Sequence, residues 1–211
     1  MLLLTVILNR GIIMIFDDEK LAQDVPILSA MAAEMANYLD SDILFWPLSG
    51  SRMPRLTLGG YLMRQQRLLI LKNSLTVDKQ NEVDTAVFQF NQALINRLVR
   101  FEQKAQHEIE ARLRQWGAYL NDLVRGTVVT RGYYATAVEP RVMITVLIDE
   151  LSLAPYKLEP GIERQVTMAD TRFRHQWVPG EFVWPDGWQP AYPETDYWFL
   201  YGLPRSKEGK K

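Results

Sequence analysis

Few residues of this chain have the chemistry that catalysis or metal binding requires. It contains two histidines, His107 and His175, and no cysteine. Without cysteine, disulfide bonds, thiolate nucleophiles and thiolate metal ligands are all excluded. Two isolated histidines do not form a histidine-rich metal centre, and the Glu-x-x-His pairs of di-iron helical bundles are absent. We therefore expect neither a metal nor a cofactor.

His175 ends a short charged sequence that begins at Asp170 and includes Arg172 and Arg174. The two guanidinium groups are suited to an anion, and Asp170 is a possible acid–base partner of the imidazole. Asp170 and His175 are five positions apart, however, and this is not a helical contact spacing. Salt bridges and a surface imidazole are the simpler interpretation, and Arg172, Arg174 and His175 remain candidate binding residues.

The other catalytic patterns are incomplete. The serines at 49 and 51 lack the Gly-x-Ser-x-Gly turn of a nucleophile, and Gly59-Gly60 lacks the lysine or third glycine of a phosphate loop. Asp149 and Glu150 are neighbours, so on a helix they point in directions about 100° apart. His107 lies in a charged run typical of a solvated helix face. We expect no catalytic residue.

Residues 177–201 have an unusual composition, with nine of the 23 aromatic residues and four of the 11 prolines. Such rings can stack on a sugar, a base or a proline-rich peptide, so Trp188, Tyr192 and Tyr201 are candidate binding residues. Burial is the simpler use of large aromatic side chains. We expect an ordered strap without regular secondary structure, packed on the rest of the chain, with Trp184 and Trp198 mostly buried.

The strongest periodic pattern predicts one unbroken helix over residues 82–124, in which apolar residues recur every three or four positions. Its first half has additional apolar residues at Phe88, Ile95 and Val99, which predicts an enclosed environment. Its second half has only a narrow stripe. We therefore expect a protein partner, or a second copy of the chain, to bind the residues Ile109, Leu113, Trp116 and Leu120.

Shorter elements are predicted on both sides of this helix. We expect a helix at 25–39 capped by Asp24, an ordered loop or one short strand at 40–55, and a helix at 57–73 capped by Thr57. Gly126 is expected to end the long helix, and a short strand or loop is expected at 127–134. We then expect a helix at 138–151, with a strand at 141–148 as the alternative, and a short helix at 162–176.

These elements predict an all-α fold of four or five helices around the long one, with an α+β fold containing a hairpin at 127–150 as the alternative. The expected organisation is a helical domain at 1–176, a strap at 177–204 and a disordered tail at 205–211.

The bulk composition is that of an ordinary globular chain, with 47% hydrophobic and 23% charged residues. The net charge of −1 provides no global attraction for nucleic acid. Residues 1–16 are apolar, but Asn9, Arg10 and Gly11 interrupt them, and a membrane span needs about 20 apolar residues. We interpret them as a buried strand or helix, or as an extension before Met14, and expect a cytoplasmic protein that binds neither membrane nor nucleic acid.

The missing catalytic motifs and the one-sided stripe favour a non-catalytic protein–protein interaction or scaffold module. The alternative is a small-molecule-binding protein or enzyme with a pocket between the helical body and the strap. The first function requires an exposed apolar surface, whereas the second requires a concave pocket with polar groups.

Overall fold

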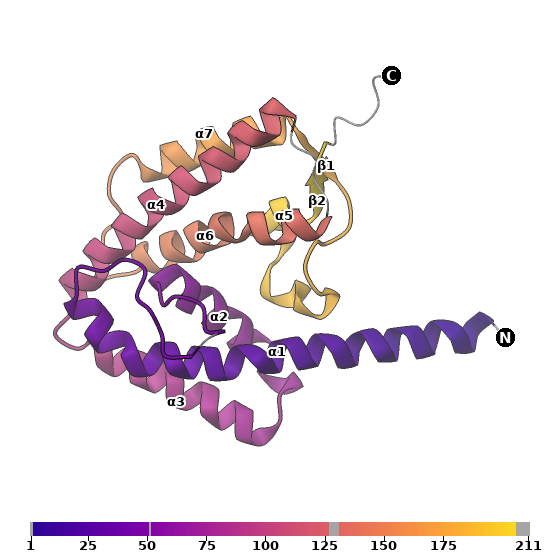
Figure 1. Cartoon of the computed structure of the whole chain (residues 1–211), viewed down its shortest axis with the longest axis horizontal. Coiled ribbons are helices and arrows are strands. Elements are labelled where there is room, and N and C mark those ends of the chain that lie inside the picture. Colours follow the sequence, from indigo (N-terminus) through magenta and orange to yellow (C-terminus); the bar gives the residue numbers. More distant parts are fainter. Residues whose placement is uncertain (1, 51, 127–130, 206–211) are drawn as a thin grey trace.

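The protein is mainly helical, as expected (Figure 1). The computed structural model describes residues 2–50, 52–126 and 131–205, with the backbone alone described for 2–18. Its α-helices are α1 (Leu2–Asp40), α2 (Leu58–Ile70), α3 (Val77–Leu94), α4 (Leu98–Arg125), α5 (Arg131–Ala137), α6 (Glu139–Leu151), α7 (Ile162–Arg174) and α8 (Glu194–Tyr197). Short 3-10 helices are η1 (Lys72–Ser74), η2 (Asp186–Ala191) and η3 (Trp198–Leu200). Strands β1 (Trp177–Pro179) and β2 (Gly202–Pro204) pair antiparallel.

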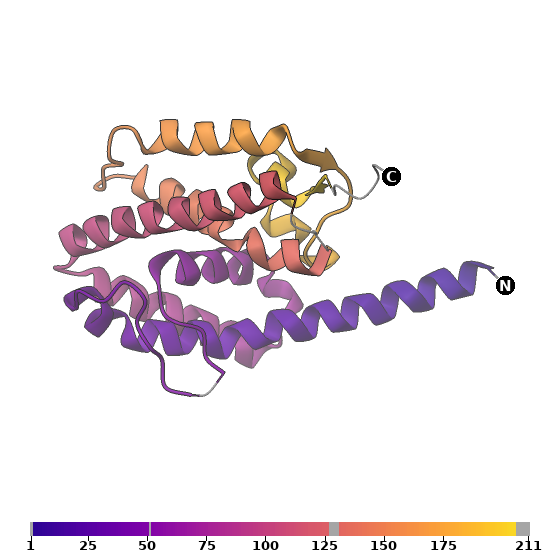
Figure 2. The ribbon, with the colours of Figure 1, turned by 45° about the horizontal axis from the view of Figure 1, so that its top comes forward.

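The helices form two groups that α2 joins. α1 packs on α3 and α2, while α4 packs on α6, α7 and α2. Figures 1 and 2 show α1 and α3 side by side, with α4, α6 and α7 on the other side of α2. The N-terminal part of α1 extends beyond this body in both views. Because α2 contacts both groups, its position determines how the remaining helices meet.

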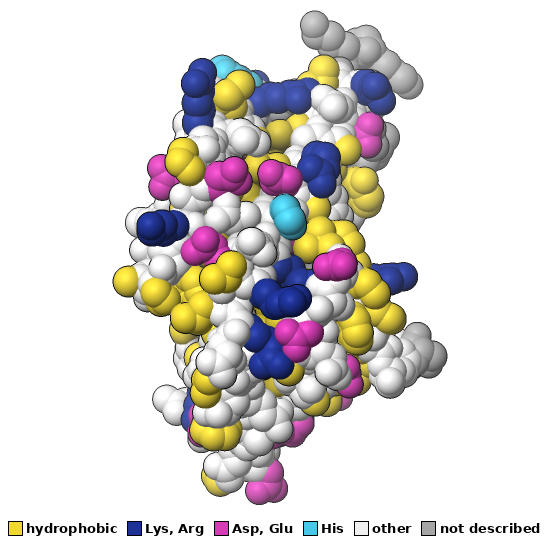
Figure 3. Space-filling model, turned by 90° about the vertical axis from the view of Figure 1, so that its left-hand side faces the viewer, with side chains coloured by type: hydrophobic (Ala, Val, Ile, Leu, Met, Phe, Trp, Pro, Cys, Tyr) yellow, Lys and Arg dark blue, Asp and Glu magenta, His cyan; other side chains and the backbone are white. Residues whose placement is uncertain are grey.

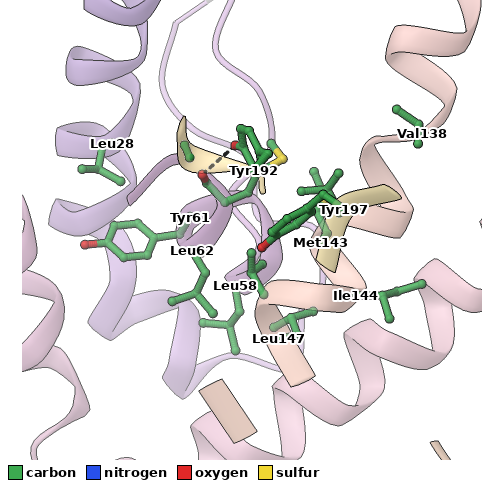
Figure 4. Close-up of a cluster of buried hydrophobic side chains, with 14 of the residues drawn as sticks. Leu28, Leu58, Tyr61, Leu62, Val138, Met143, Ile144, Leu147, Tyr192 and Tyr197 are labelled. Atoms are coloured by element: carbon green, nitrogen blue, oxygen red, sulfur yellow. Dashed lines mark hydrogen bonds between the residues drawn. The ribbon is translucent and has the colours of Figure 1, made fainter. Parts of the chain in front are cut away.

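The buried core runs through the middle of this arrangement. Leu58 and Leu62 of α2 lie opposite Met143 and Leu147 of α6, and Tyr197 covers them from the C-terminal segment (Figure 4). Each of these side chains is at most 7% exposed. The core is therefore built jointly by the helices and by the aromatic strap.

Several element boundaries follow directly from local sequence. Thr57 caps α2 as predicted, because its Oγ1 accepts a hydrogen bond from the Gly60 amide at 3.0 Å. Gly126 ends α4 at a φ of 93°, where glycine avoids the steric penalty of a side chain. The predicted helices at 138–151 and 162–176 are confirmed as α6 and α7.

The alternative with a strand at 141–148 is wrong, and so is the α+β fold with a hairpin at 127–150. Val142, Val146 and Leu151 are buried at helical spacing within α6. The short strand or loop expected at 127–134 is replaced from Arg131 onward by α5, while residues 127–130 lie outside the described part of the chain.

Asp24 does not begin a helix. It lies inside α1, which starts far upstream and also contains Pro26. The Asp24 side chain is buried and bound by Arg67, whose Nε is 2.9 Å from its carboxylate. The sequence Asp-x-Pro has the composition of a helix start, but here the carboxylate is used for a tertiary ion pair instead.

The predicted unbroken helix at 82–124 is wrong. The chain turns at Ile95–Arg97, between α3 and α4, and Asn96 has a φ of 66°. Asparagine is one of the few residues other than glycine that visit this left-handed conformation readily. The turn lets α3 pack on α1 while α4 crosses to α6 and α7, and the two apolar stripes belong to separate helices.

This turn reverses the expected environments of the two halves. Phe88, Ile95 and Val99 are 62%, 52% and 68% exposed, whereas Ile109 and Trp116 are fully buried. Leu120 is buried as well, and Leu113 is half-buried against the core. The predicted partner surface at Ile109, Leu113, Trp116 and Leu120 is therefore wrong, because α6 and α7 already cover that side of α4.

The strap packs on the helical body as expected. Trp184 is 8% exposed, and its indole Nε1 donates to the Ala135 carbonyl at 2.7 Å. Trp198 is half-buried, with its ring centroid 5.7 Å from that of Phe173. Contrary to expectation, the strap contains regular elements, which are β1, η2, α8, η3 and β2. The tail expected at 205–211 lies outside the described residues from 206 onward.

Candidate binding face at the turn between helices 3 and 4

The aromatic candidates of the strap are used mainly for packing. Tyr192 is fully buried, donates its hydroxyl hydrogen to the Met63 carbonyl and accepts from Arg67 at 3.1 Å. Tyr201 is half-buried and donates to the Tyr192 carbonyl at 2.8 Å. Trp188 is also half-buried, with the Arg67 guanidinium 3.8 Å from its ring centroid. None of the clefts described below is lined by these three rings.

The charged candidates at the end of α7 contact other residues than those rings. Arg172 donates to Asn121 at 2.6 Å, Arg174 stacks on the Trp198 ring at 3.7 Å, and His175 ends α7 as an exposed residue. Asp170 binds Arg141 through two hydrogen bonds of 2.8 and 2.7 Å. Asp170 thus pairs with Arg141 rather than with His175, and none of the six candidates lines a main hollow in the described part of the chain.

The buried carboxylates of α1 and α4 are each paired with arginine. Asp24 lies between Arg67 and Arg64, whose Nε is 3.2 Å from the carboxylate. Burial lowers the pKa of Arg64, while Asp24 raises it in opposition. Glu108 is fully buried, accepts from Arg112 and also accepts from the Gly59 amide at 3.0 Å. These groups hold α1, α2 and α4 together.

A first surface groove lies between α1 and α3, with a volume of about 460 Å³. Its walls include Ala33, Ala36 and Phe88, and it reaches Arg97 at the end near the turn. Phe88 is 62% exposed although it lies beside this apolar wall. A large aromatic side chain in that position is available to a binding partner.

A second hollow surrounds the turn itself and has a volume of about 700 Å³. Leu98 and Val99 line it together with Arg97, Arg100 and Gln103. Leu98 is 43% exposed and Val99 is 68% exposed. Because Arg97 belongs to both hollows, the apolar surface continues from Phe88 around the turn.

A third hollow, which we call the α4 cleft, lies between α4 and residues 39–44. Its volume is about 440 Å³, and it is lined by Leu39, Ser41, Asp42, Leu44, Arg100, Gln103, Lys104, His107, Glu110 and Arg114. Arg100 and Gln103 also line the second hollow. We call the three connected hollows the docking face.

Figure 3 views the side of the molecule on which this turn lies. Hydrophobic side chains gather in separate groups on this side, and Lys and Arg side chains lie close together between them. Acidic side chains are interspersed with the basic ones. The surface is therefore amphipathic rather than uniformly charged.

Hydrogen bonds hold the charged part of the docking face in place. Arg97 donates twice to Asp40, at 3.0 and 2.8 Å. These bonds from Arg97 lower the pKa of Asp40. The Lys104 ammonium donates to the carbonyls of Ser41 and Ile43, each at 2.9 Å. Burial lowers the pKa of Lys104, while Asp42 opposes this effect.

The sequence pattern contained part of this face. Phe88, Ile95 and Val99 stand out as a second apolar flank, but one continuous helix places them against a core. The spacing of apolar residues gives no sign of the turn at Asn96, and this turn places the three side chains toward solvent. The sequence places His107 in an ordinary charged run, because the segment 39–44 that forms the other wall is distant in sequence.

In the described residues, no group of three or more His, Asp or Glu side chains has the geometry to hold a metal ion. None of the described helices has the length and apolar composition needed to cross a membrane. Comparisons with protein-family models, with curated proteins and with solved structures give no match to this chain.

Proposed function

We propose that this chain is a non-catalytic protein-interaction module whose partner binds the docking face. The observation that supports the proposal is the exposure of Phe88, Leu98 and Val99 in connected hollows. Apolar side chains that line connected concave surfaces are typical of binding sites, whereas isolated exposed ones are common on any surface. Arg97 and Arg100 border them, and arginine is frequent in protein interfaces.

The ion pairs in the protein interior also favour a non-catalytic function. Asp24 and Glu108 are buried, and each binds an arginine inside the fold. A catalytic acid or base needs access to a substrate, and carboxylates that are engaged in this way have none. They are better explained as groups that fix the relative positions of the helices.

A small-molecule site beside the strap is the competing function. A hollow of about 380 Å³ lies next to β1 and β2 and is lined by Arg131, Glu181 and Arg205 among others. However, Arg131 already binds the Glu181 carboxylate and the Phe182 carbonyl. Arg131 and Glu181 therefore satisfy each other, and the docking face is the better candidate.

Site-specific crosslinking tests the proposed function. Photoreactive benzoylphenylalanine is placed at Val99 or Phe88, and also at Met168, a control on α7 that is 64% exposed. We expect one protein from the source cells to crosslink at Val99 and Phe88 under light, with at least tenfold less product at Met168. Equal products at all three positions, or none above the dark control, would reject an interaction module that uses this face.

A further inference from the structure

The floor of the α4 cleft contains a cation that has no carboxylate partner among the described ion pairs. Lys104 is 8% exposed, and its ammonium lies 4.2 Å from the centroid of the Tyr38 ring. Its two carbonyl acceptors, on Ser41 and Ile43, use two of the three N–H groups of an ammonium. The charge is therefore fixed in position by dipoles but is not neutralised by direct contact.

Two arginines at the edge of the cleft add positive charge. The Arg100 side chain is 55% exposed, with its Nε 3.9 Å from the Asp40 carboxylate that Arg97 already binds. The Arg114 side chain is 72% exposed and lies 3.9 Å from Glu110. Arg100 also donates from one Nη to the Asp40 carbonyl at 3.1 Å. Both guanidinium groups keep donors available, because each has five N–H groups and these contacts use only some of them.

We propose that the α4 cleft binds one anionic group, a carboxylate or a phosphate, on a peptide segment of the partner. This inference rests on the proposed function and specifies the chemistry of the partner. The anion contacts Lys104 at the floor and Arg100, which lies one helical turn away, while Arg114 adds positive charge at the far edge of the cleft. Apolar residues of the same segment contact Leu98 and Val99, because Arg100 and Gln103 line both hollows.

The acidic residues of the cleft limit the charge of its ligand. Asp42 and Glu110 line it, and both are exposed. The cleft contains three cations, Arg100, Lys104 and Arg114, and these two carboxylates, so its formal charge is three minus two, or one positive charge. A polyanion such as nucleic acid would be repelled by these carboxylates. A single anionic group that reaches Lys104 avoids them.

Titration of the full chain with simple anions tests the cleft directly. Sodium phosphate and sodium acetate are added separately at constant ionic strength, with sodium chloride as the reference, and backbone amides are followed by NMR. We expect saturable shifts at residues 39–44 and 100–114 for at least one of the two anions. The doubly substituted variant R100Q/R114Q should bind at least tenfold more weakly, whereas R164Q, at an exposed position on α7, should bind as the wild type does. Only linear, non-saturating shifts would overturn the inference.

Three fluorescent peptides of identical leucine-rich sequence distinguish the anion sources. They contain one glutamate, one phosphoserine or one glutamine at the same position. Binding of the glutamate or phosphoserine peptide at least tenfold tighter than the glutamine peptide supports the inference and identifies the preferred anion. Equal binding of all three overturns it.

The crosslinking experiment separates this inference from the proposed function. If R100Q/R114Q crosslinks to the partner through Val99 as efficiently as the wild type does, the anion subsite is rejected and the interaction module is retained. If the wild type gives no crosslinked partner although phosphate binds, the interaction module is rejected, and with it the peptide ligand proposed here.

Discussion

Gly59 lies where the first turn of α2 meets α4 and α6. A Cβ atom at this position would be 2.9 Å from both the Glu108 carboxylate and the Met143 side chain. Both neighbours are buried, so neither has free space into which to move. The absence of a side chain at Gly59 also lets its amide donate to Glu108.

We predict that Gly59→Ala lowers the free energy of unfolding by about 1–3 kcal/mol, as overpacking of a core does. The matched change is Gly117→Ala in α4, where a Cβ atom would meet nothing within 4 Å. This change should raise stability by up to about 1 kcal/mol, because alanine favours helix more than glycine does. Urea denaturation measures the free energy of unfolding of both variants. Equal changes in the two variants would contradict the close packing around Gly59.

Glu139, in the first turn of α6, is a second residue with a testable energetic cost. Burial raises its carboxyl pKa above the ordinary value of 4.5, although Arg64, Arg67 and Arg112 act in the opposite direction. A raised folded-state pKa means that the ionised form destabilises the folded protein at neutral pH. This cost disappears as the pH falls through the raised value toward 4.5.

We therefore predict that Glu139→Gln increases the free energy of unfolding at pH 7, and that the difference from the wild type shrinks as the pH falls to about 4.5. Glu159→Gln, at an exposed position, is the control for loss of one charge. Thermal unfolding across this pH range gives the measurement. A Glu139→Gln protein that is less stable than the wild type at pH 7 would show that the arginines outweigh burial.

At the scale of elements, the turn between α3 and α4 determines which side chains are exposed. Asn96 is the only described residue other than glycine with a positive φ. An ordinary L-residue pays about 1–2 kcal/mol in the left-handed region. We predict that Asn96→Ala lowers stability by about 1 kcal/mol, whereas Asn96→Gly leaves it nearly unchanged, because glycine adopts this conformation without strain.

Urea midpoints of the two variants, compared with the wild type, measure this difference. If Asn96→Ala were instead stabilising, the left-handed turn would not be the preferred conformation there. A continuous helix through residues 95–97 would then be favoured, and Phe88 and Val99 would no longer be separated by a turn.

At the scale of the whole molecule, the strap completes the core. Phe182, Trp184, Tyr192, Phe199 and Leu200 are each at most 8% exposed, and Tyr192 and Phe199 contact arginines of α2 and α6. Removing one large core side chain costs about 3–5 kcal/mol. Removing five exceeds the total stability of a typical domain, which is about 5–15 kcal/mol.

We predict that a chain ending at Gln176 shows no cooperative thermal unfolding and exposes apolar surface that binds a hydrophobic dye. A chain ending at Arg205 retains every described residue of the strap and is the control. Cooperative melting of the shorter chain at the same temperature would show that the strap is dispensable and that residues 1–176 fold alone.

The sequence by itself determined the elements whose signals are local. Thr57 begins α2, Gly126 ends α4, and α6 and α7 follow from apolar spacing, because capping and helical periodicity depend on residues within a few positions of one another. The composition of the strap also indicated its burial, since so many aromatic rings are costly to leave in water.

Tertiary structure alone decided the use of Asp24, the turn at Asn96 and the composition of the docking face. Asp24 has the composition of a cap, but Arg67, 43 residues away, binds its carboxylate inside α1. The two apolar stripes continue one period across Asn96, so periodicity could not reveal the turn. Lys104 became the floor of a cleft only because the carbonyls of Ser41 and Ile43 lie beside it. These contacts join residues far apart in the chain, and their energies depend on how whole helices pack, which no local pattern specifies.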